Sequence, residues 1–363
     1  MINEVRLIAF YLPQFHPIPE NDEWWGTGFT EWTNVTKAKS LFKGHHQPHI
    51  PADLGFYDLR LPQVRKAQAD LAKEYGISGF CYWHYWFGNG KRLLEHPFNE
   101  VIKSGEPDFP FCLAWANETW SGIWMGSPDK VLIEQQYPGR EDFVKHFYHI
   151  LNALKDRRYI RIKNQPLFLI YRPHSFNSKE FIDIWQNLAI KEGIGKIYFV
   201  GVSDHTNPVD YCFDGFVPNS PLPVIQKVLN KKKYQTENIF GKIKKKMNLD
   251  KAKPATILYK DFVNEIDRDP LKDGLFPVLL PNWDNTPRSG INGYVIHESS
   301  PELFRQHISK TYNSIKHRPA ENQIIFLKSW NEWAEGNYME PDQQFGKQYL
   351  EELKNEMENL NKN

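Results

Sequence analysis

The chain has 363 residues, and its 45 basic side chains nearly balance its 44 acidic ones, which gives a formal net charge of +1 at pH 7. This balance argues against a general nucleic-acid binder, because such a protein needs a dominant basic field to neutralise phosphates. Hydrophobic residues make up 40% of the chain, which excludes disorder of the whole chain. No apolar run of about 18 residues occurs, so no membrane-spanning helix is predicted.

Eight short apolar segments are predicted to be strands, at 5–12, 77–86, 109–116, 166–171, 196–202, 213–218, 276–281 and 323–329. Segments with helical periodicity follow most of them, at 59–75, 91–104, 140–157, 178–192, 300–317 and 343–360. Apolar strands joined by helical crossovers are typical of a parallel sheet, and eight such units predict an α/β fold, the (β/α)₈ TIM barrel. The alternative is a doubly wound open sheet, but no Gly-x-Gly-x-x-Gly motif follows the first strand.

Two long insertions are predicted, a Trp- and Pro-rich one at 14–58 after strand one and another at 221–275 after strand six. We expect residues 1–363 to form a single glycosidase-like barrel domain around them. The second insertion carries ten lysines between Lys227 and Lys253. Such a run is typical of a solvated helix face. The alternative is a patch that contacts an anionic membrane or a lipid-linked glycan.

The amino-terminal segment has neither a basic stretch nor a small-residue cleavage site, so no secretory signal peptide is predicted and we expect a cytoplasmic protein. Three widely spaced cysteines predict neither a disulfide scaffold nor a cysteine-based zinc site. We expect no metal or other cofactor. The histidines at 45–49 lie in a Pro-rich loop, and the Asp-x-Asp match at 267–269 is isolated in a hydrophilic insertion.

Aromatic residues gather where the predicted strands end, which is where a barrel carries its chemistry. Eleven of the 12 tryptophans lie in or just after these ends, and only Trp185 lies in a predicted helix. A glycan cleft explains this bias, since aromatic rings pack against sugar C–H faces and polar groups bind the hydroxyls. The alternative is a second small core over the barrel mouth. The predicted glycan contacts are Tyr11, His16, Trp24, Trp115, Asn117, Glu118, Tyr171, Arg172, Trp283, Asp284, Asn331 and Trp333.

Two carboxylates three positions apart, Glu332 and Glu335, follow the last predicted strand. On a straight strand these positions face opposite ways, but Gly336 permits a turn that brings both to one place. Neighbouring carboxyl groups split their proton affinities, so that one stays ionised as a base and the other keeps a proton as an acid. Glycosidic cleavage requires this division of labour, and we therefore predict Glu332 and Glu335 to be catalytic.

Three parts of the chain resemble the WbsX-type family, namely RLIAFYLPQF at 6–15, the Trp-rich elements at 24–32 and SWNEWAEGNYMEP at 329–341. The likeness covers essentially the whole chain. This family is related to glycoside hydrolase family 99, the endo-acting α-mannosidases and α-mannanases, and that likeness is confined mainly to the last motif and the barrel order. The resemblance implies a (β/α)₈ barrel, no cofactor and a catalytic Glu pair.

By the same resemblance, Glu332 is expected to take the proton of the sugar 2-hydroxyl and Glu335 to protonate the leaving oxygen. This fits α-linked mannose or rhamnose, in which the 2-oxygen and the leaving group lie on opposite faces of the ring. The 2-oxygen then attacks the anomeric carbon, and water or another sugar opens the 1,2-anhydro intermediate with net retention. The family hydrolases commonly carry His where this chain has Ala334.

Three alternatives stay open. Glu118 and Glu332 both follow an Asn at a strand end, which is the pattern of retaining barrel enzymes with an acid and a direct nucleophile about 5 Å apart. WbsX-type proteins occur with surface-polysaccharide genes, so the chain is alternatively a glycosyltransferase of cell-surface polysaccharide (lipopolysaccharide) synthesis. A carbohydrate-binding barrel without activity is the third.

Overall fold

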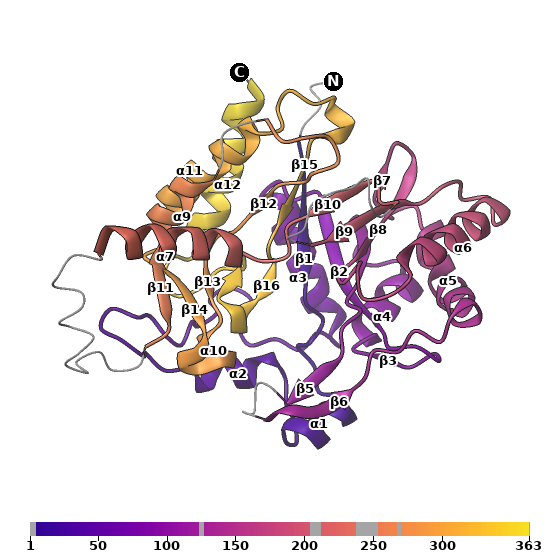
Figure 1. The fold of residues 1–363 in the computed structure, drawn as a ribbon, viewed down its shortest axis with the longest axis horizontal. Coiled ribbons are helices and arrows are strands. Elements are labelled where there is room, and N and C mark those ends of the chain that lie inside the picture. Colours follow the sequence, from indigo (N-terminus) through magenta and orange to yellow (C-terminus); the bar gives the residue numbers. More distant parts are fainter. Residues whose placement is uncertain (1–4, 123–126, 204–211, 237–252, 267–269, 363) are drawn as a thin grey trace.

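A (β/α)₈ barrel is the centre of the computed structural model, which describes residues 5–122, 127–203, 212–236, 253–266 and 270–362 (Figure 1). Its eight parallel strands are β1 (Arg6–Tyr11), β2 (Gly79–Trp86), β4 (Phe111–Trp115), β8 (Gln165–Ile170), β9 (Tyr198–Val202), β10 (Gly215–Val217), β12 (Val278–Leu279) and β15 (Ile324–Leu327). They are ordered β10-β9-β8-β4-β2-β1-β15-β12, and a parallel bridge from Phe216 to Leu275 joins the two ends. The predicted α/β barrel is confirmed, with all eight strands in the predicted order.

The six predicted helices are present and surround the barrel: α3 (Pro62–Glu74), α4 (His96–Ser104), α5 (Arg140–Lys155), α6 (Ser178–Lys191), α11 (Pro301–Asn313) and α12 (Gln348–Lys362). Their ends follow local chemistry. The Asn177 side chain accepts a hydrogen bond from the backbone N–H of Glu180 at the start of α6, and Gly105 follows α4 with a left-handed φ of 75°.

The insertion at 14–58 is more ordered than the predicted loop, since it contains α1 (Pro19–Trp25) and α2 (Glu31–Lys37). These short helices were not predicted because the proline and glycine residues of the insertion favour a loop. Asp284 ties this insertion to the barrel, because its Oδ2 accepts hydrogen bonds of 2.6 Å from both His45 Nε2 and Gln47 Nε2.

Residues 222–236, 255–265 and 283–297 form a second layer beside the barrel (Figure 1). It contains α7 (Leu222–Thr236), α9 (Tyr259–Glu265), the short helix α10 (Thr286–Ser289) and a sheet ordered β11-β14-β13. These strands are β11 (Ala255–Leu258), β13 (Trp283–Asp284) and β14 (Tyr294–His297), and the sequence reasoning missed all three. A separate cluster of buried side chains packs this layer, including Ile225, Ile257, Phe262 and Ile296.

Short strands complete the structure: β3 (Arg92–Leu93), β5 (Trp120–Gly122), β6 (Ser127–Ile133), β7 (Arg161–Ile162), β16 (Asn331–Glu332) and β17 (Asn337–Tyr338). Within the described ranges, no helix combines the length and the apolar composition needed to cross a membrane. The single-domain arrangement and the cytoplasmic location stay predictions.

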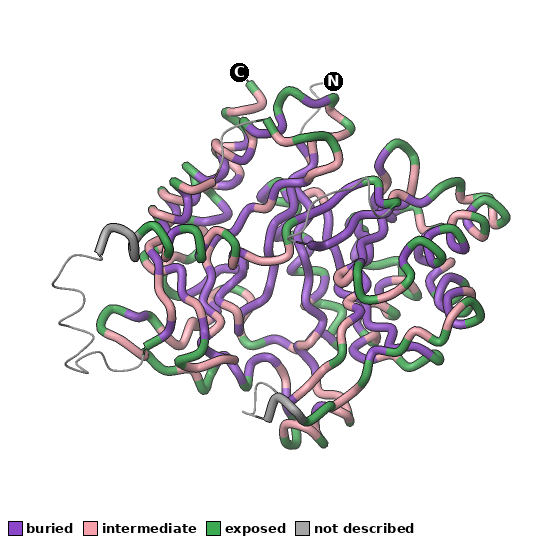
Figure 2. Tube along the Cα trace, viewed as in Figure 1, coloured by how far each residue is buried: buried purple, intermediate pink, exposed green. Residues whose placement is uncertain are grey.

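The main core fills the barrel and the space beneath its helices, as the purple strands of Figure 2 show. Among the 11 tryptophans that the structure describes, eight are buried: Trp32, Trp83, Trp86, Trp115, Trp185, Trp283, Trp330 and Trp333. Many of them pack against other rings; Trp115, for example, lies 5.2 Å from Phe181 between ring centroids. The clustering of tryptophan at strand ends is thus explained largely by packing, as the alternative interpretation held.

Candidate active site

Glu332 and Glu335 are carried by a reversal of the chain after β15. The antiparallel pair β16–β17 places Glu332 opposite Asn337, and a 3₁₀ turn at Trp333–Glu335 lies between the two strands. Gly336 closes this turn with a left-handed φ of 57°. The bend removes the opposite orientation that a straight strand imposes at a spacing of three, and both carboxylates reach the same cation.

That cation is Arg288 of α10, which the sequence reasoning did not identify. Its Nη1 lies 2.7 Å from Glu335 Oε1 and 3.8 Å from Glu332 Oε1. Its Nη2 lies 3.0 Å from Oε2 of Glu31, at the start of α2. The Arg288 side chain is only 10% exposed, and those of Glu332 and Glu335 are 11% and 17% exposed. One guanidinium therefore holds three carboxylates from two separate parts of the chain, and the Glu pair keeps some access to solvent.

The two carboxylates of the pair have different surroundings. Burial, and next the charge of Glu335, raise the pKa of Glu332 to about 7. Arg288, Lys328 and a 2.9 Å hydrogen bond from Ser329 Oγ oppose this rise. Burial alone would lower the pKa of Arg288, but the charges of Glu31, Glu335 and Glu332 raise it, so the guanidinium stays charged. Near neutral pH, a substantial fraction of Glu332 therefore carries a proton, while Glu335 directly contacts a cation.

Two tyrosines lie close to the pair. Burial, and next the charge of Glu332, raise the pKa of Tyr85 at the end of β2. Burial raises the pKa of Tyr171 to about 12, and the charges of Glu118 and Glu335 act in the same direction. Both hydroxyls therefore stay protonated near neutral pH and are available as hydrogen-bond donors beside the carboxylates.

Glu118 and Arg172 form an ion pair at the ends of β4 and β8, and the Arg172 guanidinium lies 4.7 Å from the centroid of the Tyr171 ring. The predicted contacts Glu118, Tyr171 and Arg172 are thus brought together. Glu118 contributes to the raised pKa of Tyr171, which Glu335 also affects, so this group borders the Glu pair. Glu118 pairs with Arg172, whereas Glu332 and Glu335 share Arg288.

Several predicted contacts instead hold the scaffold. Tyr11 donates a 2.7 Å hydrogen bond to Gln68 of α3, and Asn331 bonds both the N–H and the C=O of Leu12. Trp115 lies buried between the sheet and its helices, with its Nε1 bonded to a backbone carbonyl. Trp333 donates to Glu340 at 2.6 Å and stacks on Tyr338 with 3.8 Å between centroids. Tyr11 and Trp115 therefore face the surrounding helices, and Asn331 and Trp333 hold the chain around the turn.

Most of the remaining predicted contacts are buried, and only Trp24 is partly exposed. His16 is 2% exposed and lies with Nδ1 2.9 Å from the carbonyl of Pro13. Trp283 is buried in the second layer, and Asn117 bonds the backbone of Arg172 on both sides. Trp24 keeps partial exposure and packs edge-on against Trp120 at 6.1 Å. Of these, Trp24 is the best placed to meet a ligand.

Lysines of the second insertion are partly described. Lys227 and Lys231 lie 3.4 Å and 2.5 Å from the carboxylate of Glu265, as on a solvated helix face. Residues 237–252 lie outside the described ranges, so the predicted contact with a membrane or lipid-linked glycan stays a prediction. The strand-five end at 204–205 and the Asp-x-Asp match at 267–269 lie outside them too.

The turn at Gly336 gives a first prediction. A Cβ added there would lie 2.7 Å from the backbone N of Asp284, and the residue's φ is already strained for any other amino acid. Gly336→Ala is expected to lower the free energy of unfolding by about 2 kcal/mol or more, as measured by denaturant titration. Gly346→Ala is the matched control, because it has nearly the same φ of 55° with nothing within 4 Å of an added Cβ. Equal losses in both variants would contradict the prediction.

Fold and site together define a (β/α)₈ barrel protein with an acidic pair beyond its eighth strand. The chain belongs to the family described as Glycosyltransferase WbsX, whose model matches residues 7–353. It is 38% identical over 356 residues to the uncharacterized protein WxcX of Xanthomonas campestris pv. campestris, in each of two strains. The alignment covers 95% of this chain and 48% of WxcX, so the chain spans about half the length of the curated relatives it matches.

Solved structures with the same fold include a glycoside hydrolase-like protein, with a TM-score of 0.57, 15% identity, and 98% of this chain and 94% of the other covered. The GH99 endo-α-mannosidase of Bacteroides thetaiotaomicron, in complex with bis-tris propane, matches with a TM-score of 0.56 at 13% identity over 98% of both chains. The chain therefore shares its fold with these proteins, which confirms the (β/α)₈ barrel expected from the resemblance.

Proposed function

We propose that this chain is a carbohydrate-active enzyme that acts on α-linked manno-configured glycans, built from mannose or rhamnose, with net retention. The observation that carries the proposal is the shared contact of Glu332 and Glu335 with Arg288, together with burial that raises the pKa of Glu332 to about 7. An acid and a base side by side at the end of a barrel strand is what glycosidic bond cleavage requires.

The chemistry needs only these two groups and the sugar's own 2-hydroxyl. The ionised carboxylate accepts the 2-hydroxyl proton while O2 forms a bond to the anomeric carbon, and the bond to the leaving oxygen breaks. The protonated carboxyl gives its proton to that oxygen. Water then attacks the anomeric carbon and opens the 1,2-anhydro ring. Water gives one of its protons to the acid residue, and O2 takes back its original proton from the base residue. Both residues return to their starting state, and the two inversions give retention.

The surroundings of the pair support Glu332 as the acid and Glu335 as the base. The pKa of Glu332, raised to about 7, leaves a substantial fraction of this carboxyl protonated near neutral pH, whereas Glu335 is the carboxylate in direct 2.7 Å contact with Arg288. This order is the reverse of the one that the family resemblance implies, so we propose it as a property of this chain's own electrostatics.

The pH dependence tests this order. A carboxyl whose pKa is about 7 is protonated below that pH and ionised above it, so an enzyme that needs protonated Glu332 is expected to lose kcat/KM as pH rises through 7. The measurement is kcat/KM between about pH 5 and pH 9, because this ratio reports the free enzyme. If Glu332 were instead the base, kcat/KM would rise through the same interval.

Function itself is tested by incubating the purified protein with α-mannan or α-rhamnan fragments and no added donor, and measuring new reducing ends. Their release supports hydrolysis. The family description favours a second candidate, transfer, in which a sugar hydroxyl replaces water in the same opening step. Turnover that requires an acceptor sugar would support transfer in cell-surface polysaccharide synthesis. Glycan binding with no turnover of either kind would support a binding protein instead.

A further inference from the structure

A cavity of about 500 Å³ lies outside the barrel mouth, between α4, α5 and the strands β2 and β4. Its volume is within the range of small-molecule sites, which is about 300–1,000 Å³. Apolar side chains from three of these elements line part of it, including Phe98, Leu113 and Ile150. Polar side chains line the rest, which is the usual composition of a ligand site.

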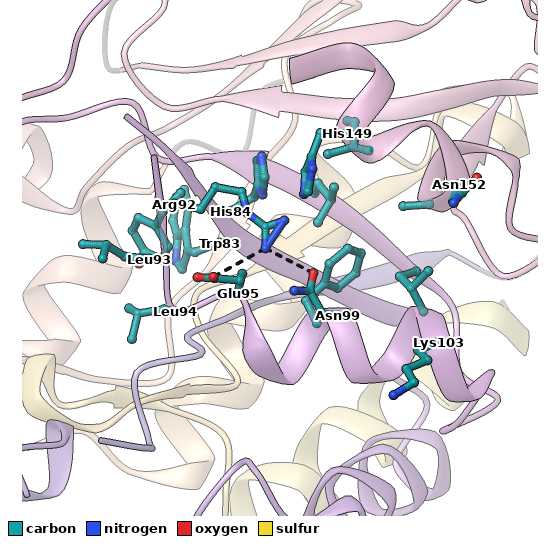
Figure 3. A pocket seen from close by; sticks show the side chains of 16 residues that line it. Trp83, His84, Arg92, Leu93, Leu94, Glu95, Asn99, Lys103, His149 and Asn152 are labelled. Atoms are coloured by element: carbon teal, nitrogen blue, oxygen red, sulfur yellow. Dashed lines mark hydrogen bonds and ion pairs between the residues drawn. The ribbon is translucent and has the colours of Figure 1, made fainter. Parts of the chain in front are cut away.

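Arg92 reaches into the middle of this cavity, with His84 and His149 on one side and Asn99 on the other (Figure 3). The Arg92 side chain is 11% exposed, yet its counter-charge among the described residues is Glu95 at 3.6 Å. Arg92 also donates a 3.4 Å hydrogen bond to Asn99 Oδ1. Both contacts are long for a guanidinium, whose charge-assisted bonds are usually below 3 Å. Arg92 is thus a largely enclosed cation with little direct neutralisation.

The other polar groups of the cavity are mainly donors. Lys103 and Asn99 come from α4, and His149 and Asn152 come from α5. Glu95 is the one acidic side chain among the lining residues. Donors that approach from two helices and from the sheet suit a tetrahedral anion with three free oxygens better than a planar carboxylate with two.

We propose that this cavity binds a small phosphate-bearing molecule, with Arg92 and His149 on the phosphate and the rest of the ligand on the apolar wall. Arg92 supplies a planar pair of donors to two phosphate oxygens. The lining includes none of Glu31, Arg288, Glu332 or Glu335, so the site is distinct from the Glu pair, although Tyr85 of β2 borders both. It therefore does not depend on the proposed function.

The test is calorimetric titration of the full chain with inorganic phosphate, mannose 1-phosphate and mannose. We expect the two phosphate compounds to bind and mannose to add no heat at this site. Arg92→Gln is expected to weaken binding at least tenfold, and His149→Ala, which changes an exposed side chain, to weaken it severalfold. Arg305→Gln is the control, because Arg305 is an exposed arginine whose ion pairs are also long, at 3.8 and 4.0 Å. It is expected to bind as the unchanged protein does.

Three outcomes would overturn the proposal. The first is no binding of either phosphate compound at millimolar concentration. The second is unchanged binding in Arg92→Gln and His149→Ala. The third is loss of mannose 1-phosphate binding in Glu332→Gln but not in Arg92→Gln, which would place the ligand at the Glu pair. Circular dichroism shows whether each variant is folded. If Arg92→Gln does not fold, His149→Ala still tests the proposal.

Discussion

Glu332→Gln is expected to lower kcat/KM on a natural glycan by about 10³-fold, and Glu335→Gln by a similar factor, because general acid and base groups each contribute about 10² to 10⁴. Glutamine keeps the size of the side chain and removes the transferable proton or the accepting charge. Glu118→Gln is the matched control, since Glu118 is a strand-end carboxylate held by Arg172 rather than Arg288. We expect that variant to lose less than tenfold. A loss in Glu118→Gln as large as that in Glu332→Gln would favour the alternative pairing.

The leaving group separates the two roles within this prediction. A glycosyl fluoride or nitrophenyl glycoside needs little protonation of its leaving group, so it is expected to restore much of the kcat of the acid variant and little of the base variant. We expect recovery in Glu332→Gln. Recovery in Glu335→Gln alone would restore the order implied by the family resemblance. Unchanged turnover of every substrate in both variants would leave the pair without a catalytic role.

The barrel could be predicted because its elements are locally encoded. Apolar runs such as 166–171 alternate with amphipathic segments such as 178–192, and the structure places β8 and α6 there. The sheet β11-β14-β13 could not be predicted in this way. Its strands have only two to four residues, and the paired strands β11 and β14 are separated by residues 259–293. Pairing between distant segments, rather than a local sequence pattern, therefore defines these strands.

Site residues could be predicted where they stand together in one short motif. They could not be predicted where their role depends on the direction in which the side chain points. Glu332 and Glu335 stand together in the sequence, and the turn at Gly336 brings them to one cation. Tyr11 and Trp115 also stand at strand ends, but both face the helices. Their orientation follows from the register of each strand, which strand-end position alone does not reveal.

Arg288 escaped prediction for a related reason. It lies in a four-residue helix of the loop that follows the seventh barrel strand, 44 positions before Glu332 in the chain. The one local indication was a cation shortly after the aromatic and acidic strand end Trp283-Asp284. Glu31 lies still further away in sequence, although its segment was noted for the family resemblance. Only the packing of α2 and α10 against the 3₁₀ turn brings these charges together.

Arg288→Met is expected to lower the free energy of unfolding by about 3–5 kcal/mol at neutral pH, because it leaves buried carboxylates without their counter-charge. The loss is expected to depend on pH. Without the opposing charge of Arg288 the pKa of Glu332 rises further, so the variant gains stability as pH falls and Glu332 becomes protonated, and it loses stability as pH rises. Denaturant titrations at about pH 5.5 and pH 8 measure this difference.

A second substitution shows whether charge or packing is responsible. Glu31 contacts Arg288 but is not expected to touch the substrate, so Glu31→Gln in the Arg288→Met background removes one uncompensated charge at little change in volume. We expect the double variant to recover part of the stability at pH 8 and little at pH 5.5, where protonation has already neutralised the site. Equal losses at both pH values, with no recovery, would mean that Arg288 acts through its packing. In that case the raised pKa of Glu332 would owe its value to burial and Glu335, without control by the shared cation.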